Sequence, residues 1–190
     1  MLTDNIFQGQ KIYLAAVEPK ELAQAMHRWG SDSEYLRLLD SDPARRFSAT
    51  INQSWIEKNL ESHANDGFWF TIRTCDEDRL VGDISLEIVN WIHGEAFVGI
   101  GIGDRQDWGK GYGTEAMQLL LRYAFHELNL HRVTLNVFDY NLRAIRSYEK
   151  AGFRIEGRVR QIMRRDGERH DFVYMGILDS EWEAQHETSA

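Results

Sequence analysis

The chain has 190 residues, of which 43% are hydrophobic, 12% aromatic and 27% charged. This usage is typical of a globular protein, and a chain of this length can bury about 70% of its extended surface, so we expect one domain over residues 1–190. A lone cysteine, Cys75, excludes an internal disulfide and a cysteine-rich zinc site. No apolar run approaches the ~18 residues of a membrane span, and the N-terminus lacks a signal-peptide pattern, so we expect a soluble cytoplasmic protein without a membrane partner.

The charge is negative overall but divided along the chain. The 22 Lys and Arg residues against 30 Asp and Glu residues give a net charge of −8, which disfavours a nucleic-acid partner. Residues 105–178 carry 13 basic and 9 acidic side chains, a net of +4, which leaves a net of −12 for the remainder. The basic part can accept a polyanion. The acidic part would attract cations, or it is an ordinary solvated surface.

The first part of the chain is predicted to contain one strand and two helices. Residues 11–17 alternate between apolar and polar side chains, which is typical of a strand. Pro19 suits the first position of a helix, and apolar residues follow at helical spacing until Gly30. Residues 31–46 indicate a loop with short helical turns, and a second helix is expected over 48–63.

An antiparallel meander of three strands is predicted next. The strands are expected over 68–74, 80–90 and 95–103, separated by a polar turn and a glycine turn. The middle strand has an apolar face and a polar face, Ile84, Leu86 and Ile88 against Asp83, Ser85 and Glu87.

The periodicity then changes. Apolar residues between 117 and 128 recur at i, i+3, i+4 and i+7, the strongest helical pattern in the chain. A strand over 132–138, a short helix over 141–151 ended by Gly152, and a hairpin of two strands complete the order. The hairpin strands are expected over 153–164 and 169–178. This order predicts an α/β (α+β) fold with a mixed, mostly antiparallel sheet flanked by helices.

A glycine-rich loop, Trp108-Gly109-Lys110-Gly111-Tyr112-Gly113-Thr114, lies between the third meander strand and the strongest helix. A helix N-terminus offers free N–H groups and about half a positive charge, and glycines let a phosphate approach the backbone. The G-x-G-x-G spacing differs from the dinucleotide fingerprint and from a Walker A loop. Taken alone, the loop also suits a flexible strand-to-helix connection.

A second motif lies on the next helix, Asn141-x-x-Ala144-x-x-x-Tyr148-x-x-x-Gly152-Phe153. The two motifs together resemble the GNAT acyltransferase superfamily, over about residues 10–180 and most specifically over 95–178. Segments 108–116, 129–135 and 166–175 resemble the branch that contains ribosomal-protein N-terminal acetyltransferases and bacterial polyamine acetyltransferases. The chain departs from many members at Trp108, where they have Arg or Gln, and this removes one phosphate-side contact.

The resemblance implies a single-domain GNAT fold and acetyl-CoA as co-substrate. It implies that the pyrophosphate lies in the glycine loop and that the pantetheine arm lies along the strand 97–103, whose N–H groups polarise the thioester carbonyl. Asn141 is expected to contact CoA, to cap its own helix, or to do both. The other cofactor-binding residues implied are Ile100, Gly101, Ile102, Gly109, Lys110, Gly111, Tyr112, Gly113 and Thr114.

Two side chains are expected to be catalytic. By the resemblance, Tyr148 is the general acid that protonates the CoA thiolate, although a tyrosine on an amphipathic helix is more commonly a core residue. Glu87, on the polar strand face, is the best candidate for a general base; Glu95 and His93 are weaker alternatives. The histidines show no metal spacing, so no metal is expected. An acidic turn beside Cys75 disfavours a thiolate and hence a covalent cysteine intermediate.

The sequence therefore predicts transfer of acetyl from acetyl-CoA to a primary amine by direct attack in a ternary complex. The acceptor is left open between a protein N-terminus, a polyamine and another small amine. A non-catalytic CoA-binding regulatory module is the alternative function. A homodimer is a further expectation, because the tail strands of this family often support one.

Overall fold

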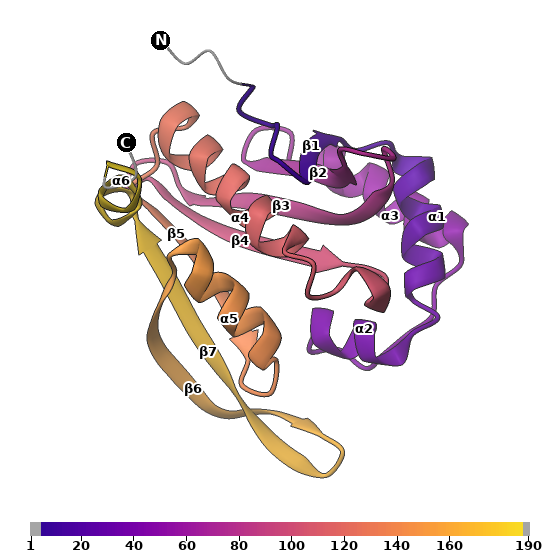
Figure 1. Cartoon of the computed structure of the whole chain (residues 1–190). Coiled ribbons are helices and arrows are strands. Elements are labelled where there is room, and N and C mark those ends of the chain that lie inside the picture. Colours follow the sequence, from indigo (N-terminus) through magenta and orange to yellow (C-terminus); the bar gives the residue numbers. More distant parts are fainter. Residues whose placement is uncertain (1–4, 188–190) are drawn as a thin grey trace.

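The structure is a computed structural model that describes residues 5–187 (Figure 1). Its strands form one sheet in the order β1-β2-β3-β4-β5-β7-β6. Every neighbouring pair is antiparallel except β4 with β5, which is parallel. This confirms the mixed, mostly antiparallel sheet. The strands are β1 (Ile12–Ala16), β2 (Gly67–Thr74), β3 (Leu80–Asn90), β4 (Glu95–Ile102), β5 (Arg132–Phe138), β6 (Arg154–Arg165) and β7 (Glu168–Leu178).

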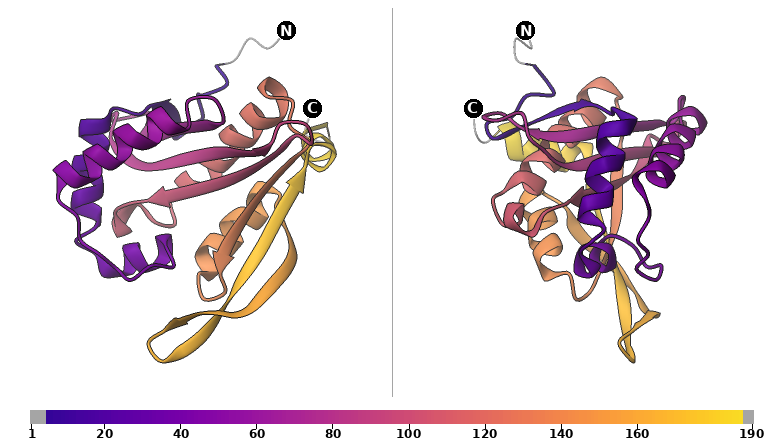
Figure 2. Two further views of the ribbon diagram at one scale, coloured as in Figure 1. Left: turned by 180° about the vertical axis from the view of Figure 1, so that it is seen from behind. Right: turned by 90° about the vertical axis from the view of Figure 1, so that its right-hand side faces the viewer.

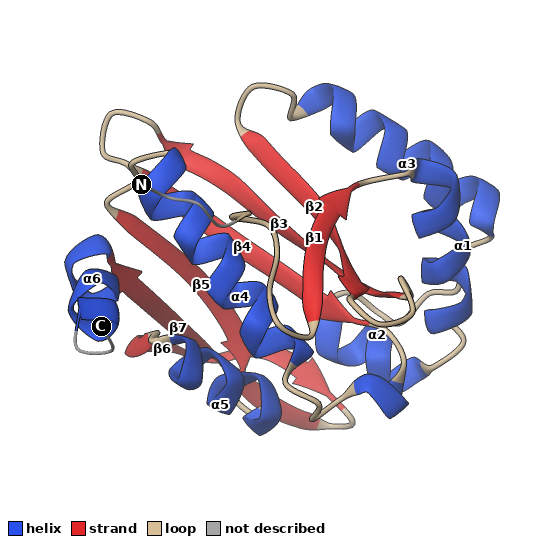
Figure 3. Cartoon of the chain, turned by 45° about the horizontal axis from the view of Figure 1, so that its top comes forward, coloured by secondary structure: helices blue, strands red, loops and turns tan. Residues whose placement is uncertain are grey.

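Helices cover both faces of the sheet. The helices are α1 (Pro19–Trp29), α2 (Ser33–Leu39), α3 (Ala49–Ser62), α4 (Tyr112–Arg122), α5 (Leu142–Ala151) and α6 (Asp179–Glu187). Helices α4 and α5 lie in front of the sheet (Figure 3), and α3 lies on the reverse side, where it packs against α1 (Figure 2). A 3₁₀ turn (Arg105–Asp107) precedes the glycine loop, and a π-helical turn (Tyr123–Glu127) extends α4.

The predicted elements are present close to their predicted bounds, and their ends have the expected caps. Ser48 caps α3 by accepting a hydrogen bond from the Ile51 N–H. Gly152 ends α5 in the left-handed conformation, with φ of 106°, as its position predicts. Helix α6 was not predicted, because its sequence is almost wholly polar. Its one large apolar residue, Trp182, is buried against Phe125 at a ring distance of 6.2 Å.

The two faces of β3 meet different surroundings. Ile84, Leu86 and Ile88 belong to the main core, which also contains the buried residues of α4. The opposite face turns towards α1 and α3. The alternation predicted from the sequence is therefore confirmed, and it places Asp83, Ser85 and Glu87 on the reverse side of the sheet.

The sheet opens between β4 and β5. These strands pair only over Glu95–Phe97 and Arg132–Thr134 and then separate. The Gly103 N–H bonds the Val81 carbonyl at 2.9 Å, so odd-numbered residues in this segment point their N–H groups at β3. By alternation, Ile100 and Ile102 direct their N–H groups to the open edge. Free backbone donors of β4 therefore face the opening.

The β6–β7 hairpin projects away from the rest of the molecule (Figures 1 and 2). Its tip is nevertheless tied to the α2 region. The Arg165 guanidinium donates hydrogen bonds to the carbonyls of Arg37 and Asp40, and Arg37 forms an ion pair with Asp166. The hairpin thus helps to position α2, which contributes residues to the candidate site.

Candidate active site

A cavity of about 340 Å³ lies where β4, the glycine loop, α2 and α5 meet. It receives residues from both sequence motifs and from the open edge of β4, so segments distant in the chain form one site. The lining residues are Tyr35, Leu38, Leu39, Ile100, Gly101, Ile102, Asp107, Trp108, Gly109, Gly111, Tyr112, Gly113, Thr114, Asn141, Arg143, Ala144, Arg146, Ser147, Tyr148 and Lys150.

The glycine loop presents a helix N-terminus to this cavity. Gly109 and Gly111 have φ of 78° and 92°, a conformation that L side chains rarely adopt. No side chain caps α4, and its first internal bond runs from the Glu115 N–H to the Gly111 carbonyl. The N–H groups of the first helical turn, from Tyr112 onwards, therefore have no partner within the helix. This arrangement suits an anion such as a pyrophosphate.

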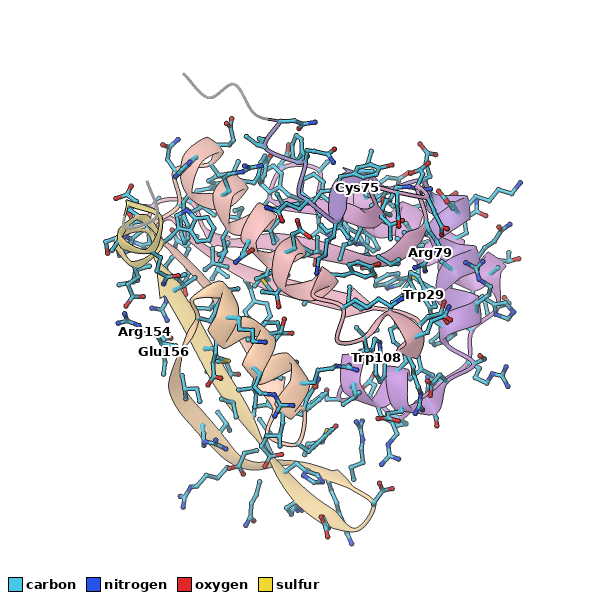
Figure 4. The ribbon with its side chains drawn as sticks, in the orientation of Figure 1. Trp29, Cys75, Arg79, Trp108, Arg154 and Glu156 are labelled. Atoms are coloured by element: carbon cyan, nitrogen blue, oxygen red, sulfur yellow. The ribbon has the colours of Figure 1, made fainter. Side chains whose placement is uncertain are left out.

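Hydrogen bonds from basic side chains hold the glycine loop in position. Arg79 donates two hydrogen bonds, of 2.6 and 2.8 Å, to the buried carboxylate of Asp107, and Lys110 adds a third of 2.9 Å. Lys11 donates to the Lys110 carbonyl at 3.0 Å. The labelled Arg79 and Trp108 mark this region in Figure 4. Because Lys110 pairs with Asp107 and does not line the cavity, its predicted contact with the cofactor has no support in this arrangement.

Three basic side chains of α5 also line the cavity, namely Arg143, Arg146 and Lys150. The Arg143 guanidinium lies 3.5 Å from the centroid of the Trp108 ring, a cation–π contact between α5 and the glycine loop. The sequence reasoning missed these three residues. Their spacing of three and four residues on the motif helix was the signal that could have found them, since it places them on one helical face.

Tyr148 lies in the same cavity. Burial raises the pKa of its phenol to about 12, and the charge of Arg143 acts in the opposite direction. The phenol therefore keeps its proton at neutral pH. Asn141 is buried, caps α5 by accepting from the Ala144 N–H at 3.2 Å and also lines the cavity, so its two predicted roles are compatible.

Glu87 is not part of this cavity. It is exposed and lines a second cavity, of about 280 Å³, on the reverse side of β2 and β3 beneath α3. The weaker candidates Glu95 and His93 line neither cavity. The structure therefore separates the predicted site residues into two groups. The structure brings Ile100, Gly101, Ile102, Gly109, Gly111, Tyr112, Gly113, Thr114, Asn141 and Tyr148 together around the first cavity and leaves Lys110 and Glu87 outside it.

Asp83 was not singled out in the sequence as a candidate. It lines the second cavity and is paired across the sheet with Gly101, which lines the first. The Trp69 indole N–H donates to its carboxylate at 3.0 Å. Burial raises the pKa of Asp83 to about 6, and the indole bond opposes that shift. No sequence signal distinguished it from Glu87 on the same strand face, because the burial arises from packing of other elements.

Other chemistries have little support among the described residues. No three His, Cys, Asp or Glu side chains there are grouped so that they could hold a metal ion. Cys75 is exposed and lies well away from Trp108 (Figure 4). None of the described helices is long and apolar enough to cross a membrane.

Comparison with known proteins identifies the class. Residues 11–154 match the Acetyltransferase (GNAT) domain family. The chain is 34% identical over 186 residues to the probable N-acetyltransferase YjcK of Bacillus subtilis, covering 92% of this chain and 97% of that protein. It is 36% identical over 106 residues to the putative ribosomal N-acetyltransferase YdaF of the same organism, covering 56% and 57%.

A solved structure supports the same conclusion. The spermidine N-acetyltransferase of Vibrio cholerae, in complex with CoA and spermine, superposes with a TM-score of 0.76 at 25% identity, covering 90% of this chain and 98% of that one. The chain therefore belongs to the GNAT acetyltransferase family. It is an N-acetyltransferase with the family's single-sheet fold, as the two sequence motifs indicated.

Proposed function

We propose that this protein transfers acetyl from acetyl-CoA to a primary amine by direct attack within a ternary complex. The observation that carries the proposal is the convergence of three features on one cavity: the uncapped N-terminus of α4, the free backbone edge of β4 and the partly buried phenol of Tyr148. CoA in the complex of the Vibrio cholerae relative supports the same donor here.

The residues would divide the work as follows. The loop backbone at Gly109, Gly111 and Gly113 holds the pyrophosphate, and Arg143, Arg146 and Lys150 add positive charge near the phosphates. The Ile100 and Ile102 N–H groups face the thioester carbonyl and stabilise negative charge that develops on its oxygen. This arrangement requires no covalent enzyme intermediate.

Tyr148 is the proposed proton donor to the departing sulfur. A thiol has a pKa near 8.5, so the thiolate is a weaker base than the Tyr148 phenolate. The proton moves from Tyr148 to the sulfur because Tyr148 regains a proton from the amine nitrogen. This nitrogen becomes strongly acidic once it is bonded to the acyl carbon. Tyr148 therefore ends the cycle protonated, and one amine proton ends on the CoA thiol.

The acceptor is proposed to be a cationic primary amine. Relatives named as spermidine acetyltransferases support a polyamine, and the relative named as a putative ribosomal acetyltransferase supports a protein N-terminus. The acidic residues near α2 give weaker support than their number suggests. Asp32 and Glu34 are both paired with Arg105, so their charge is largely neutralised.

A homodimer stays a proposal, with β6 as the contact surface. This edge strand exposes Ile155, Val159 and Ile162, which a second copy would cover. Light scattering of the purified protein measures the mass directly, and a monomeric mass at micromolar concentration contradicts the proposal.

The function is tested with acetyl-CoA and a panel of amines comprising spermidine, 1,4-diaminobutane, butylamine and a peptide with a free N-terminus. Release of free thiol, together with the acetylated amine in a mass spectrum, is the expected result. Binding of acetyl-CoA without turnover of any panel member would instead favour the non-catalytic regulatory module. Failure to bind acetyl-CoA contradicts both functions.

A further inference from the structure

The second cavity lies on the reverse side of the sheet over β2 and β3, and β3 is the strand that pairs with β4, along which the thioester would lie. It is enclosed by α3, β2 and β3, and its lining includes Trp55, Asn59, His63 and Trp69 besides Asp83 and Glu87. The lining contains no Lys or Arg, so its ionisable groups are two carboxylates and one histidine. Trp55 and Trp69 meet edge to face at a ring distance of 5.6 Å. Carboxylates beside aromatic faces favour a cation.

Asp83 stands at the boundary between this cavity and the first one. A Cβ on Gly101 would lie 3.7 Å from an Asp83 carboxylate oxygen and 3.1 Å from Leu39 Cδ1, so the carboxylate lies close to the β4 backbone at a point where Leu39 of the first cavity also packs. Gly99, the next residue on this face of β4, likewise leaves Ser85 uncovered. The two glycines therefore let the polar side chains of β3 lie close to the backbone of the reacting strand.

Tyr35 provides an independent sign that a polar group belongs at this boundary. It is 4% exposed, and its hydroxyl has no hydrogen-bond partner among the described residues. The hydroxyl lies 3.5 Å from the same point above Gly101, and its pKa is raised by burial and by the charge of Asp83. A buried hydroxyl without a partner costs free energy, so a ligand that bonds it there would recover that cost.

We propose that the cavity beneath α3 is the pocket of the amine acceptor and that Asp83 is the group that takes the first proton from its ammonium. The proposal rests on the proposed function and specifies its acceptor site. It assigns the role of base to Asp83 in place of Glu87. Glu87, four residues further along the strand and ~13 Å away between Cα atoms, attracts a second positive charge when the acceptor has one.

The proposed reaction accounts for all three protons of the acceptor's ammonium group. The ammonium gives one proton to Asp83, which later releases it to solvent, and the nitrogen lone pair then attacks the thioester carbon. As the C–N bond forms and the C–S bond breaks, a second proton reaches the sulfur through Tyr148. The third stays on the amide nitrogen. No oxidant, metal or further reactant is needed.

The Trp69 indole of β2 bonds Asp83, and Tyr35 of α2 has its pKa raised by the charge of Asp83. Glu87 of the same strand and His63, which directly follows α3, are the other ionisable groups that line the cavity. None of them is a fixed cation, so within the part of the chain that the structure describes the indole bond is the contact that stabilises the Asp83 carboxylate, and an incoming ammonium would add a second. An ammonium would lower the pKa of Asp83, and a proton moved to the carboxylate would in turn free the amine.

The experiment compares Asp83→Asn with Glu87→Gln and with the matched control Asp42→Asn, an exposed residue that lines neither cavity. Asp83→Asn is expected to lower kcat/KM at pH 7 by about 10²–10⁴-fold. In the wild type, kcat/KM is expected to rise near pH 6 as the Asp83 carboxyl loses its proton. The variant should lack this rise, so that its kcat/KM follows only the fraction of the amine that is neutral. Acetyl-CoA binding, measured by calorimetry, shows that the variant is folded and should stay within about twofold, as in the control.

Glu87→Gln is expected to raise KM for spermidine, whose terminal nitrogens are far enough apart to reach both carboxylates, several-fold with little effect on butylamine and no effect on the rise near pH 6. Tyr35→Phe should raise the amine KM while the protein stays folded. Wild-type kcat/KM in Asp83→Asn, or an unchanged rise near pH 6, overturns the assignment of Asp83. If the wild-type protein acetylates no amine, the proposed function fails as well, and the two failures are thereby distinguished.

Discussion

Asp107 is a buried carboxylate held by Arg79 across a gap of 28 residues in sequence, through two hydrogen bonds at 2.6 and 2.8 Å. The pair fixes the turn that leads into the glycine loop, and it lowers the pKa of Asp107. The position of the glycine loop therefore depends on a residue that directly precedes β3. Neither residue is part of a recognisable motif, and together they give the first prediction.

Arg79→Met should destabilise the protein by about 1–3 kcal/mol, because it removes most of the hydrogen bonding of a buried carboxylate. Acetyl-CoA should also bind more weakly, since the loop is less well positioned. Thermal melts and calorimetry measure the two effects. The double variant Arg79→Met with Asp107→Asn should recover part of the loss, because no unpaired charge remains. Equal stability of the single variant and the wild type would show that Lys110 alone suffices.

Gly111→Asp should abolish the rise in melting temperature that acetyl-CoA gives the wild type. The change places a carboxylate at the helix N-terminus, where the phosphates are proposed to bind. Gly111→Asn is the matched control, because it has the same shape without the charge and tolerates the left-handed conformation. We expect the affinity for acetyl-CoA to fall much further in the Gly111→Asp variant than in the Gly111→Asn variant. Equal affinities for the two variants would remove Gly111 from the phosphate site.

Much of the fold could be predicted because its elements carry local signals. The alternation of Ile84 and Leu86, the caps at Ser48 and Gly152, and the glycine loop before α4 are all written in short stretches of sequence. Helix α6 lacked such a signal, because its burial depends on Trp182 alone.

The candidate site was predictable only where it coincides with the two motifs. Asp83 and Glu87 are indistinguishable in the sequence, since both lie on the polar face of one strand. What separates them is the indole of Trp69 and the packing of Tyr35, which come from β2 and α2. Burial by residues that are distant in the sequence sets the pKa of a carboxyl, and no local sequence pattern predicts it.

Tyr148→Phe should lower kcat by about 10²–10⁴-fold and change the affinity for acetyl-CoA little, because it keeps the ring and removes only the proton. Single-turnover kinetics report the chemical step directly. Tyr174→Phe, a surface variant on β7, is the control and should behave as wild type. A Tyr148→Phe enzyme with the wild-type single-turnover rate would make Tyr148 a packing residue.

Asp83→Asn should stabilise the protein at neutral pH, independently of any activity. Burial raises the pKa of this carboxyl from 3.8 to about 6 in the folded state. The folded state therefore binds the proton more tightly than the unfolded state. The contribution of the Asp83 carboxyl to stability is fully present below pH 3.8 and is lost as the pH rises through about 6, above which the full cost of the buried charge is present.

Asparagine has no charge to bury and can still accept the Trp69 indole bond. The variant should therefore gain about 1–3 kcal/mol over the wild type above pH 7, and this gain should shrink towards zero near pH 4. Denaturant unfolding of both proteins across this pH range measures it. Glu87→Gln, at an exposed position of the same strand, should show no such pH-dependent gain. A loss of stability in Asp83→Asn at pH 8 would mean that the carboxylate is stabilised by its surroundings, and the proposed acceptor pocket would then lack the poorly solvated base on which it depends.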